Sequence, residues 1–524
     1  MKLHIKSLLK KLLVNKTHLL LIIILSFAFI IRIYKLADIP TGFSFDEASI
    51  GYNAYTILTT GQDEFGKFMP VYFKSFGEYK NPIQIYSTVP IIAVFHLNEF
   101  AVRLTSVLYG VASIWAIYLL SSLFVAKKQQ KTVGILSAIL LSIVPWHFHL
   151  SRVALESMMP YVFFTTLGTY FFLRKFSQKN IILSGLFFVL AIYSYFPSRI
   201  FIPCFVISLA LIYAKTLLKN WKEVTFALTI SCVMLIPFFQ YTFSPVGMAR
   251  WQSINIFQSP PDNNSLVPHI INNYISHFSY DFLFKKGDID MPGQSFSMYS
   301  VRGFGQLHLF QLPFIISGGI YLLRRKGYKQ FAVIALWLIL YPLGSCFTIN
   351  ASALATRSII GVVPLQILTA IGILWSLYFI KNVTLKRLYI GILSIVITLS
   401  FYNYLYTFYT KYPLYSSSTW GWQYGARDII NYFVQNKNHY DQLIMAPEFN
   451  APYIFFKFYA PNDFKKCTIG TLYEPRPNSN IKILYAISPH LGGHPNYKFI
   501  TKKYLYYPDG TIAFQIGEVI KHAP

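Results

Sequence analysis

The run LLLIIILSFAFIIRI at residues 19–33 is followed closely by GFSFDEAS at residues 42–49. The first stretch has the length and apolar composition of a membrane-spanning helix. The second stretch carries two adjacent carboxylates, Asp46 and Glu47, where that helix would leave the membrane. Charged groups at such positions are costly and commonly serve a function. The two stretches together therefore indicate a membrane protein and a candidate catalytic base.

The same carboxylates also have a structural interpretation. Ser44 or Asp46 is a suitable N-cap for a short helix that runs through Tyr52 and Tyr55, because both side chains accept hydrogen bonds from free backbone amides. Glu47 would then favour the positive end of that helix. A cap and a base are both consistent with the local sequence.

The composition extends the membrane assignment to most of the 524 residues. Hydrophobic residues make up 54% of the chain and charged residues 13%, and the mean hydropathy is +0.44. These values are typical of a polytopic membrane protein. The net charge of +26 does not indicate a nucleic-acid partner, because the basic residues form short clusters between apolar segments instead of one basic surface.

The alternation of basic linkers predicts the topology. Basic clusters such as residues 127–131 and 324–326 belong in the cytoplasm. Residues 82–95 are too few to cross and would reverse the alternation, so we expect an interfacial helix in the first external loop. The N-terminus is then cytoplasmic, as a retained signal anchor in the cell membrane. Eleven transmembrane helices are expected near residues 17–36, 103–125, 133–149, 159–173, 180–196, 200–214, 224–241, 308–323, 331–347, 358–380 and 388–407.

The C-terminal region differs from the rest in composition. It has mixed charge, a turn signal at Pro508-Asp509-Gly510, strand-like runs at Gln442–Met445 and Ile481–Ile487, and a helix-like run at Tyr424–Val434. We therefore predict a polytopic all-α membrane domain over residues 1–410. A small α/β domain over residues 411–524 would lie outside the cell.

This topology gathers ionisable residues at the outer membrane face. Cations there would neutralise a lipid phosphate, and a carboxylate would deprotonate an attacking hydroxyl. A departing phosphate is already stable as an anion, so it needs cations more than a second acid. The gathered residues are Asp46, Glu47, Lys80, Arg152, Glu156, Arg199 and Arg357, with the arginines and Lys80 as candidate ligands of the phosphate.

Each of these residues also admits a structural role. Arginines at membrane ends reach toward headgroups, and Arg152 and Glu156 have the spacing of a helical salt bridge. His147 and His149 resemble half of a metal site, but alternate residues point to different faces of a helix. We therefore expect no metal site and no cofactor, although a divalent cation is the one cofactor that these histidines would admit.

The ordered motifs resemble the C superfamily of membrane glycosyltransferases, in its protein O-mannosyltransferase and lipid A aminoarabinose transferase branch. The likeness covers about residues 15–410 and is carried by Asp46-Glu47, Glu78-Tyr79-Lys80-Asn81-Pro82, NEFAVRL at 98–104 and SRVALE at 151–156. The resemblance implies an inverting transfer of a sugar from a polyprenyl-phosphate donor to an acceptor hydroxyl on the extracytoplasmic side. It places the general base on Asp46 or Glu47 and donor-phosphate binding on Lys80. Glu156 would be the acid of the second loop.

Two other functions remain as alternatives. A lipid-linked polysaccharide polymerase or ligase would place its key residues in the late external loop, over residues 250–302. A transporter of lipid-linked sugars would show ionisable residues in the middle of its spans and paired repeats. The expected partners are a lipid-linked sugar, membrane lipids and an acceptor that is a lipid, a glycan or a protein.

Overall fold

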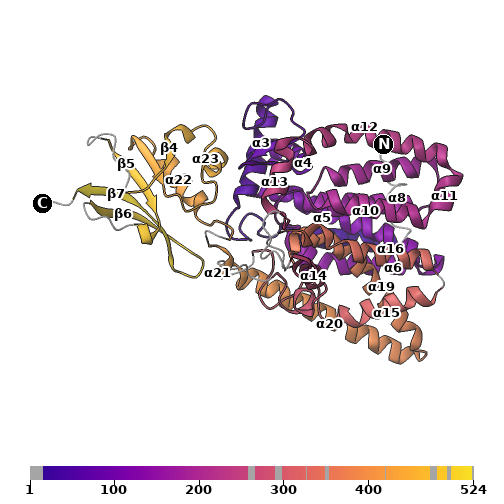
Figure 1. Cartoon of the computed structure of the whole chain (residues 1–524). Helices are drawn as coiled ribbons and strands as arrows, with labels where there is room; N and C mark the ends of the chain where they lie inside the picture. The colour runs from indigo at the N-terminus through magenta and orange to yellow at the C-terminus, as the bar shows by residue number, and fades with distance from the viewer. Residues whose placement is uncertain are drawn as a thin grey trace, which may run out of the picture.

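The computed structural model describes residues 16–257, 266–288, 298–325, 327–348, 353–418, 421–472, 481–491 and 497–521. The chain forms a large body of helices that run side by side, and a smaller domain with a β-sheet stands at one end of it (Figure 1). The architecture is thus mostly helical with a small C-terminal sheet, as the sequence predicts. The domain boundary near residue 411 stays a prediction.

The helical body contains most of the elements. From its N-terminus to the middle of the chain these are α2 (Lys16–Ile33), α3 (Phe45–Thr60), β1 (Phe73–Ser75), β2 (Glu78–Lys80), α4 (Pro82–Phe95), α5 (Glu99–Ser121), η1 (Ser122–Phe124), η2 (Lys127–Gln129), α6 (Gln130–Ile143), α7 (Pro145–Leu150), α8 (Met158–Leu173), α9 (Gln178–Ile192), α10 (Ser198–Ile212), α11 (Ala214–Lys219) and α12 (Trp221–Thr242). They continue as α13 (Pro245–Ile254), α14 (Leu266–Ser276), η3 (Asp281–Lys285), α15 (Gln311–Arg324), α16 (Tyr328–Leu340), α17 (Leu343–Cys346), α18 (Ala355–Ser358), η4 (Ile359–Gly361), α19 (Val362–Phe379), α20 (Val383–Thr410) and α21 (Tyr412–Ser416).

The predicted spans all fall on helices of this body, namely α2, α5, α6, α8, α9, α10, α12, α15, α16, α19 and α20. Six helical segments in the described part of the chain are individually long and apolar enough to cross a membrane. These findings support a multi-pass membrane protein. The count of eleven crossings and the sides on which the termini lie stay predictions.

The segment predicted as one span over residues 133–149 is interrupted. Helix α6 ends at Ile143, Val144 is extended, and the short α7 begins at Pro145. Proline disfavours helical geometry in the residue before it and has no amide hydrogen for the helix ladder. The prediction of a continuous helix here is therefore wrong, because α6 and α7 are separate helices.

Close helix contacts in the body depend on small residues. A Cβ atom added to Gly318 of α15 would lie 2.1 Å from the Leu368 carbonyl oxygen, and one added to Gly372 of α19 would lie 2.0 Å from that of Phe314. Glycine therefore lets α15 and α19 pack backbone to backbone, as small residues do between membrane helices.

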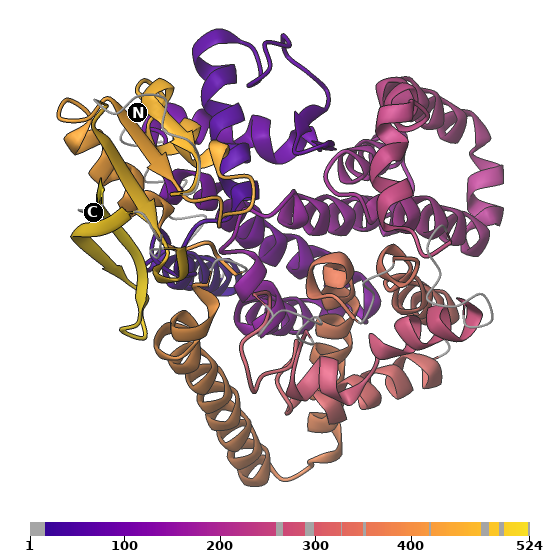
Figure 2. The same ribbon diagram turned by 60° about the vertical axis from the view of Figure 1, so that its left-hand side comes forward.

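The C-terminal domain contains a five-stranded sheet in the order β4-β3-β5-β7-β6. Strand β3 is parallel to β4 and β5, whereas β7 is antiparallel to β5 and β6. In Figure 2 the orange-brown α20 leads directly into this domain. Its elements are α22 (Ala426–Asn436), β3 (Gln442–Met445), α23 (Tyr453–Tyr459), η5 (Phe464–Lys466), β4 (Cys467–Ile469), β5 (Ile483–Ile487), η6 (Pro489–Leu491), β6 (Tyr497–Tyr506) and β7 (Ile512–Lys521).

A shared apolar core joins this domain to the segment between α2 and α5. Ile429 and Phe433 of α22 and Phe458 of α23 are buried in one cluster with Phe43 and Ala48 near the start of α3. Removing such side chains from water stabilises their association. The C-terminal domain is therefore packed against the segment that carries the acidic pair.

Candidate active site

The acidic pair lies in the first turn of α3. Ser44 is the N-cap, and its hydroxyl oxygen accepts a hydrogen bond of 3.2 Å from the Glu47 amide. The Glu47 carboxylate accepts one of 3.2 Å from the Ser44 amide in return. This reciprocal capping box satisfies two free donors of the helix start. The cap that the sequence allows is therefore present, and Ser44, not Asp46, is its N-cap residue.

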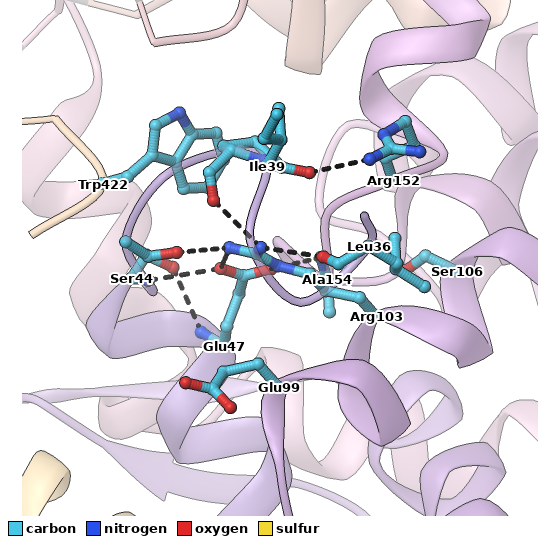
Figure 3. Close-up of polar contacts among 12 residues, drawn as sticks. Leu36, Ile39, Ser44, Glu47, Glu99, Arg103, Ser106, Arg152, Ala154 and Trp422 are labelled. Carbon is cyan, nitrogen blue, oxygen red and sulfur yellow. Dashed lines mark hydrogen bonds and ion pairs between the residues drawn. The ribbon is translucent and has the colours of Figure 1, made fainter. Parts of the chain in front are cut away.

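Glu47 is held in a fully buried ion pair. Both oxygens accept from Arg103 of α5, at 2.9 and 3.0 Å, and one also accepts from the Ala154 amide at 3.0 Å. Arg103 donates further to the carbonyl oxygens of Leu36, Pro40 and Gly42 at 2.7–3.1 Å. Figure 3 shows this arrangement, with the two side chains aligned fork to fork. Because neither side chain is exposed, Glu47 fixes the loop and does not face an acceptor.

Asp46 has the opposite surroundings. Its side chain is 25% exposed and forms an ion pair with Lys80 of β2, whose side chain is only 4% exposed. The structure thus brings together the predicted base and the predicted phosphate ligand from two separate segments of the first loop. Asp46 is therefore the more accessible member of the acidic pair.

Arg152 serves the scaffold. Its guanidinium donates to the carbonyl oxygens at the end of α2 and after it, those of Ile31, Arg32, Tyr34, Lys35 and Ile39, at 2.6–3.3 Å. Cationic side chains satisfy and stabilise the free carbonyls at a helix C-terminus. Figure 3 shows Arg152 turned toward Ile39. The segment from 151 to 157 is not helical, so the predicted helical pairing of Arg152 with Glu156 does not apply.

Three predicted site residues line one cavity of about 300 Å³. They are Glu156, Arg199 and Arg357, and they come from the loop before α8, from α10 and from α18. The remaining walls are mainly apolar and aromatic, with Phe196, Ile200 and Trp251 among them. The structure brings these three together and leaves Arg152 out of the lining.

The arginine of α10 connects this cavity to the Asp46–Lys80 pair. Arg199 donates a hydrogen bond of 3.1 Å to the side-chain oxygen of Asn81, the residue that follows Lys80. Its guanidinium lies 4.0 Å from the Phe196 ring centroid and 5.7 Å from that of Tyr72. Aromatic faces attract a guanidinium without cancelling its charge.

The short helix α18 positions the other arginine. The Asp288 carboxylate accepts a hydrogen bond of 2.6 Å from the amide of Ala355, the first residue of α18. Arg357 in turn donates to the Thr348 hydroxyl.

Glu156 has a φ of 45°, a left-handed conformation that is uncommon for a residue with a Cβ atom. Backbone strain of this kind is often concentrated at functional sites.

Tyr299 is a site residue that sequence reasoning missed. Burial raises its pKa, and the nearby carboxylates of Asp46, Asp288 and Glu156 raise it further, against the opposing effect of Arg357. The phenol therefore stays protonated and can donate a hydrogen bond near the carboxylates. Nothing in the sequence marks this tyrosine among the 39 of the chain, because it lies between η3 and α15, far in the chain from the motifs.

The segment between α20 and α22 contacts the chain both at the start of α3 and between η3 and α15. The Gln423 side-chain oxygen accepts a hydrogen bond of 2.9 Å from the amide of Phe45, the residue before Asp46. The Tyr412 hydroxyl donates to the Met298 carbonyl oxygen at 2.6 Å, and the Tyr415 hydroxyl accepts from the Arg302 amide at 2.9 Å. These contacts bracket Tyr299 on one side and support Asp46 on the other.

The two histidines of α7 are buried in separate polar contacts. His147 Nδ1 lies 3.2 Å from an Arg32 nitrogen, and His149 Nε2 lies 3.2 Å from the Tyr412 hydroxyl. Across the described ranges, no three side chains of His, Cys, Asp or Glu are grouped as metal ligands. The prediction about a divalent cation stays untested.

A family model agrees with the predicted resemblance. The model described as dolichyl-phosphate-mannose-protein mannosyltransferase matches residues 81–241. This segment contains α4 to α12 with Arg152, Glu156 and Arg199. No curated protein matches the sequence.

Solved structures share the fold at low sequence identity. ArnT from Cupriavidus metallidurans, bound to undecaprenyl phosphate, is 12% identical, and the match covers 94% of this chain and 97% of ArnT with a TM-score of 0.54. The oligosaccharyltransferase AglB from Archaeoglobus fulgidus, in complex with an inhibitory peptide and a dolichol-phosphate, is 11% identical. That match covers 84% of this chain but 63% of AglB, with a TM-score of 0.52. The family model confirms the resemblance to membrane glycosyltransferases over residues 81–241, and the solved structures extend the agreement in fold to most of the chain.

Proposed function

We propose that the protein transfers a sugar, with inversion, from a polyprenyl-phosphate donor to an acceptor hydroxyl at the extracytoplasmic face. The observation that carries this proposal is the series of charged and polar side chains that runs from Asp46 and Lys80 through Asn81 to Arg199 at the cavity. The lipid phosphates bound by ArnT and AglB support a donor of the same chemical class.

The cavity would hold the donor phosphate and the first part of its lipid. Arg199 and Arg357 place two guanidinium groups in its lining. A guanidinium group can bind two phosphate oxygens through paired hydrogen bonds. The apolar walls at Phe196, Ile200 and Trp251 suit an isoprenoid chain. Lys80 would add a third positive charge as negative charge grows on the leaving phosphate.

Asp46 would act as the general base. The acceptor oxygen attacks the anomeric carbon and forms a new C–O bond, while the bond from that carbon to the phosphate oxygen breaks. The bonding electrons leave with the phosphate, and the hydroxyl proton passes to the Asp46 carboxylate. A single displacement of this kind inverts the anomeric configuration. The ion pair with Lys80 would orient the carboxylate toward the acceptor.

The remaining predicted site residues have different roles in this proposal. Glu47 and Arg152 position the first loop through their buried hydrogen bonds. Glu156, in the cavity lining, would accept hydrogen bonds from the donor sugar. Tyr299 would donate a hydrogen bond to a substrate at the neighbouring site, since its phenol remains protonated.

A transfer assay tests the proposed function. Purified full-length protein would be incubated with a panel of radiolabelled polyprenyl-phosphate sugars and with membrane extract as the source of acceptor. We expect label to move from one donor into an acceptor fraction, with release of polyprenyl phosphate. Release of label from nucleotide-activated sugars alone, or movement of intact lipid-linked sugar across vesicles without transfer, would contradict the proposal.

A further inference from the structure

A second cavity, of about 370 Å³, lies between the helical body and the external domain. We term it the seam pocket. Its walls come from residues 35–43 after α2, from the end of α20, and from residues 423–428 at the start of α22. It shares no lining residue with the cavity assigned above to the donor. The mechanism proposed so far does not use it.

The lining of the seam pocket combines opposite charges. Arg427 forms an ion pair of 3.3 Å with Glu99, and the Tyr459 hydroxyl donates to the same carboxylate at 2.9 Å. Asp38 and Asp428 add two more carboxylates to the lining. The pocket thus offers hydrogen-bond donors and acceptors within one small volume.

Aromatic rings form part of the same walls. Tyr409 of α20 and Tyr424, just before α22, both line the pocket. Tyr424 is half-buried, and its ring centroid lies 5.9 Å from that of Tyr507 in the external domain. Tyrosine presents an apolar ring face together with a polar hydroxyl. A ligand here would meet apolar surface beside its hydrogen-bonding groups.

We propose that the seam pocket binds a saccharide portion of the acceptor, an inference that rests on the proposed function. A pyranose ring has hydroxyls that both donate and accept, and its C–H faces pack against tyrosine rings. A phospholipid headgroup fits less well. Its phosphate would face the carboxylates of Asp38, Glu99 and Asp428, which outnumber the cationic Lys35 and Arg427 in the lining.

The position of the pocket suits an acceptor that must reach Asp46. Phe43 lines the pocket and stands three residues before Asp46 in the chain, so their Cα atoms are at most about 11 Å apart. Gln423 also lines the pocket and accepts the hydrogen bond from the Phe45 amide. A short saccharide seated in the pocket would therefore lie beside the segment that carries the proposed base.

Direct binding measurements test this inference. Full-length protein in detergent, without donor, would be titrated against fluorescently labelled short oligosaccharides of neutral hexoses and of N-acetylhexosamines. We expect at least one to bind, and Tyr424→Ala and Asp428→Asn to weaken that binding by about tenfold or more, as expected for the loss of about 1.4 kcal/mol. Tyr453→Ala is the matched control, because Tyr453 belongs to the same domain, is 60% exposed and does not line the pocket.

Several results would overturn the inference. They are the binding of no oligosaccharide, equal binding by both pocket variants and the wild type, and competition by glycerophosphoethanolamine, which would make the pocket a headgroup site. Thermal stability of each variant separates lost binding from lost folding. Because binding is measured without donor, its result does not depend on the transfer assay described above. Intact saccharide binding together with failure of that transfer assay would contradict the proposed function and leave the seam pocket as a saccharide site.

Discussion

Asp46 and Glu47 are adjacent in the chain, yet they belong to different regions of the molecule. Glu47 joins Arg103 in a core where neither side chain is exposed, whereas Asp46 joins Lys80 with a quarter of its own side chain exposed. Successive residues of a helix point about 100° apart, so one turn of α3 presents one carboxylate to the scaffold and the other to the site. Two adjacent acidic residues can therefore have different roles, one in the scaffold and one in the site, which their residue types do not distinguish.

The largest expected effect follows from breaking the buried pair. Glu47→Gln leaves the Arg103 charge buried beside a neutral amide, and we expect the free energy of unfolding to fall by about 3–5 kcal/mol. Thermal unfolding in detergent would measure this loss. Glu518→Gln is the matched control, because the Lys502–Glu518 pair is more than one-third exposed on both sides and should change stability by about 1 kcal/mol or less. Equal stability of the two variants would remove the structural role of Glu47.

The Asp46–Lys80 pair should respond in donor binding. Lys80→Ala removes a cation from the proposed phosphate site, so we expect donor affinity to fall by the equivalent of about 2–4 kcal/mol. Titration with a polyprenyl phosphate would measure the dissociation constant. Lys67→Ala, at an exposed position of the same loop, should leave it unchanged. If Lys80→Ala binds the donor as tightly as the wild type, this lysine only orients Asp46.

Two arginines extend the comparison from scaffold to site. Arg152→Lys loses most of the contacts to carbonyl oxygens after α2, and we expect lower thermal stability with donor affinity unchanged in the folded fraction. Arg199→Lys should leave stability nearly unchanged and weaken donor binding by the equivalent of about 1.5–3 kcal/mol, as is typical of hydrogen bonds to charged groups. Paired melting and titration curves would test both. If instead Arg152→Lys weakened donor binding and Arg199→Lys lowered thermal stability, Arg152 would belong to the site and Arg199 to the scaffold.

The smallest expected effect concerns the external domain. Gln423→Ala removes the acceptor for the Phe45 amide, and one neutral hydrogen bond contributes about 0.5–1.5 kcal/mol. We expect transfer to slow by about three- to tenfold with donor affinity unchanged, because Asp46 loses a support and the cavity does not change. Gln442→Ala, which removes a hydrogen bond inside the external domain, should leave the rate unchanged. A change in donor affinity instead of rate would contradict the positioning role of Gln423.

Local sequence signals predicted much of the architecture. Helix α4 has the predicted ends at residues 82 and 95, β3 matches the strand expected at Gln442–Met445, and the Pro508-Asp509-Gly510 turn lies between β6 and β7. Short-range rules sufficed there because a proline, an apolar run or a turn residue acts within a few positions. Pro145 is a signal in the sequence for the interruption of the span predicted over residues 133–149. The apolar residues on both sides of it nevertheless led to the prediction of one continuous helix.

The sequence predicted which charged residues belong to the region of the site, but not which role each of them has. Sequence gathered Lys80, Glu156, Arg199 and Arg357 at one face, but it gave no means to separate Glu47 or Arg152 from them. Their partners are Arg103 and the carbonyl oxygens after α2, which lie more than fifty residues away in the chain. Contacts over such separations depend on how the helices pack. The same reason kept Tyr299 and Gln423 out of the prediction.

We propose that Asp46 performs the chemistry whereas Glu47 holds the loop. Asp46→Asn tests it most directly, because asparagine keeps the size of the side chain and removes its basicity. A single-turnover transfer assay on donor-saturated protein should show a rate reduced by about 10²–10⁴-fold, with donor affinity and thermal stability close to those of the wild type. A folded Asp46→Asn variant that transfers sugar at a rate near that of the wild type would contradict the account.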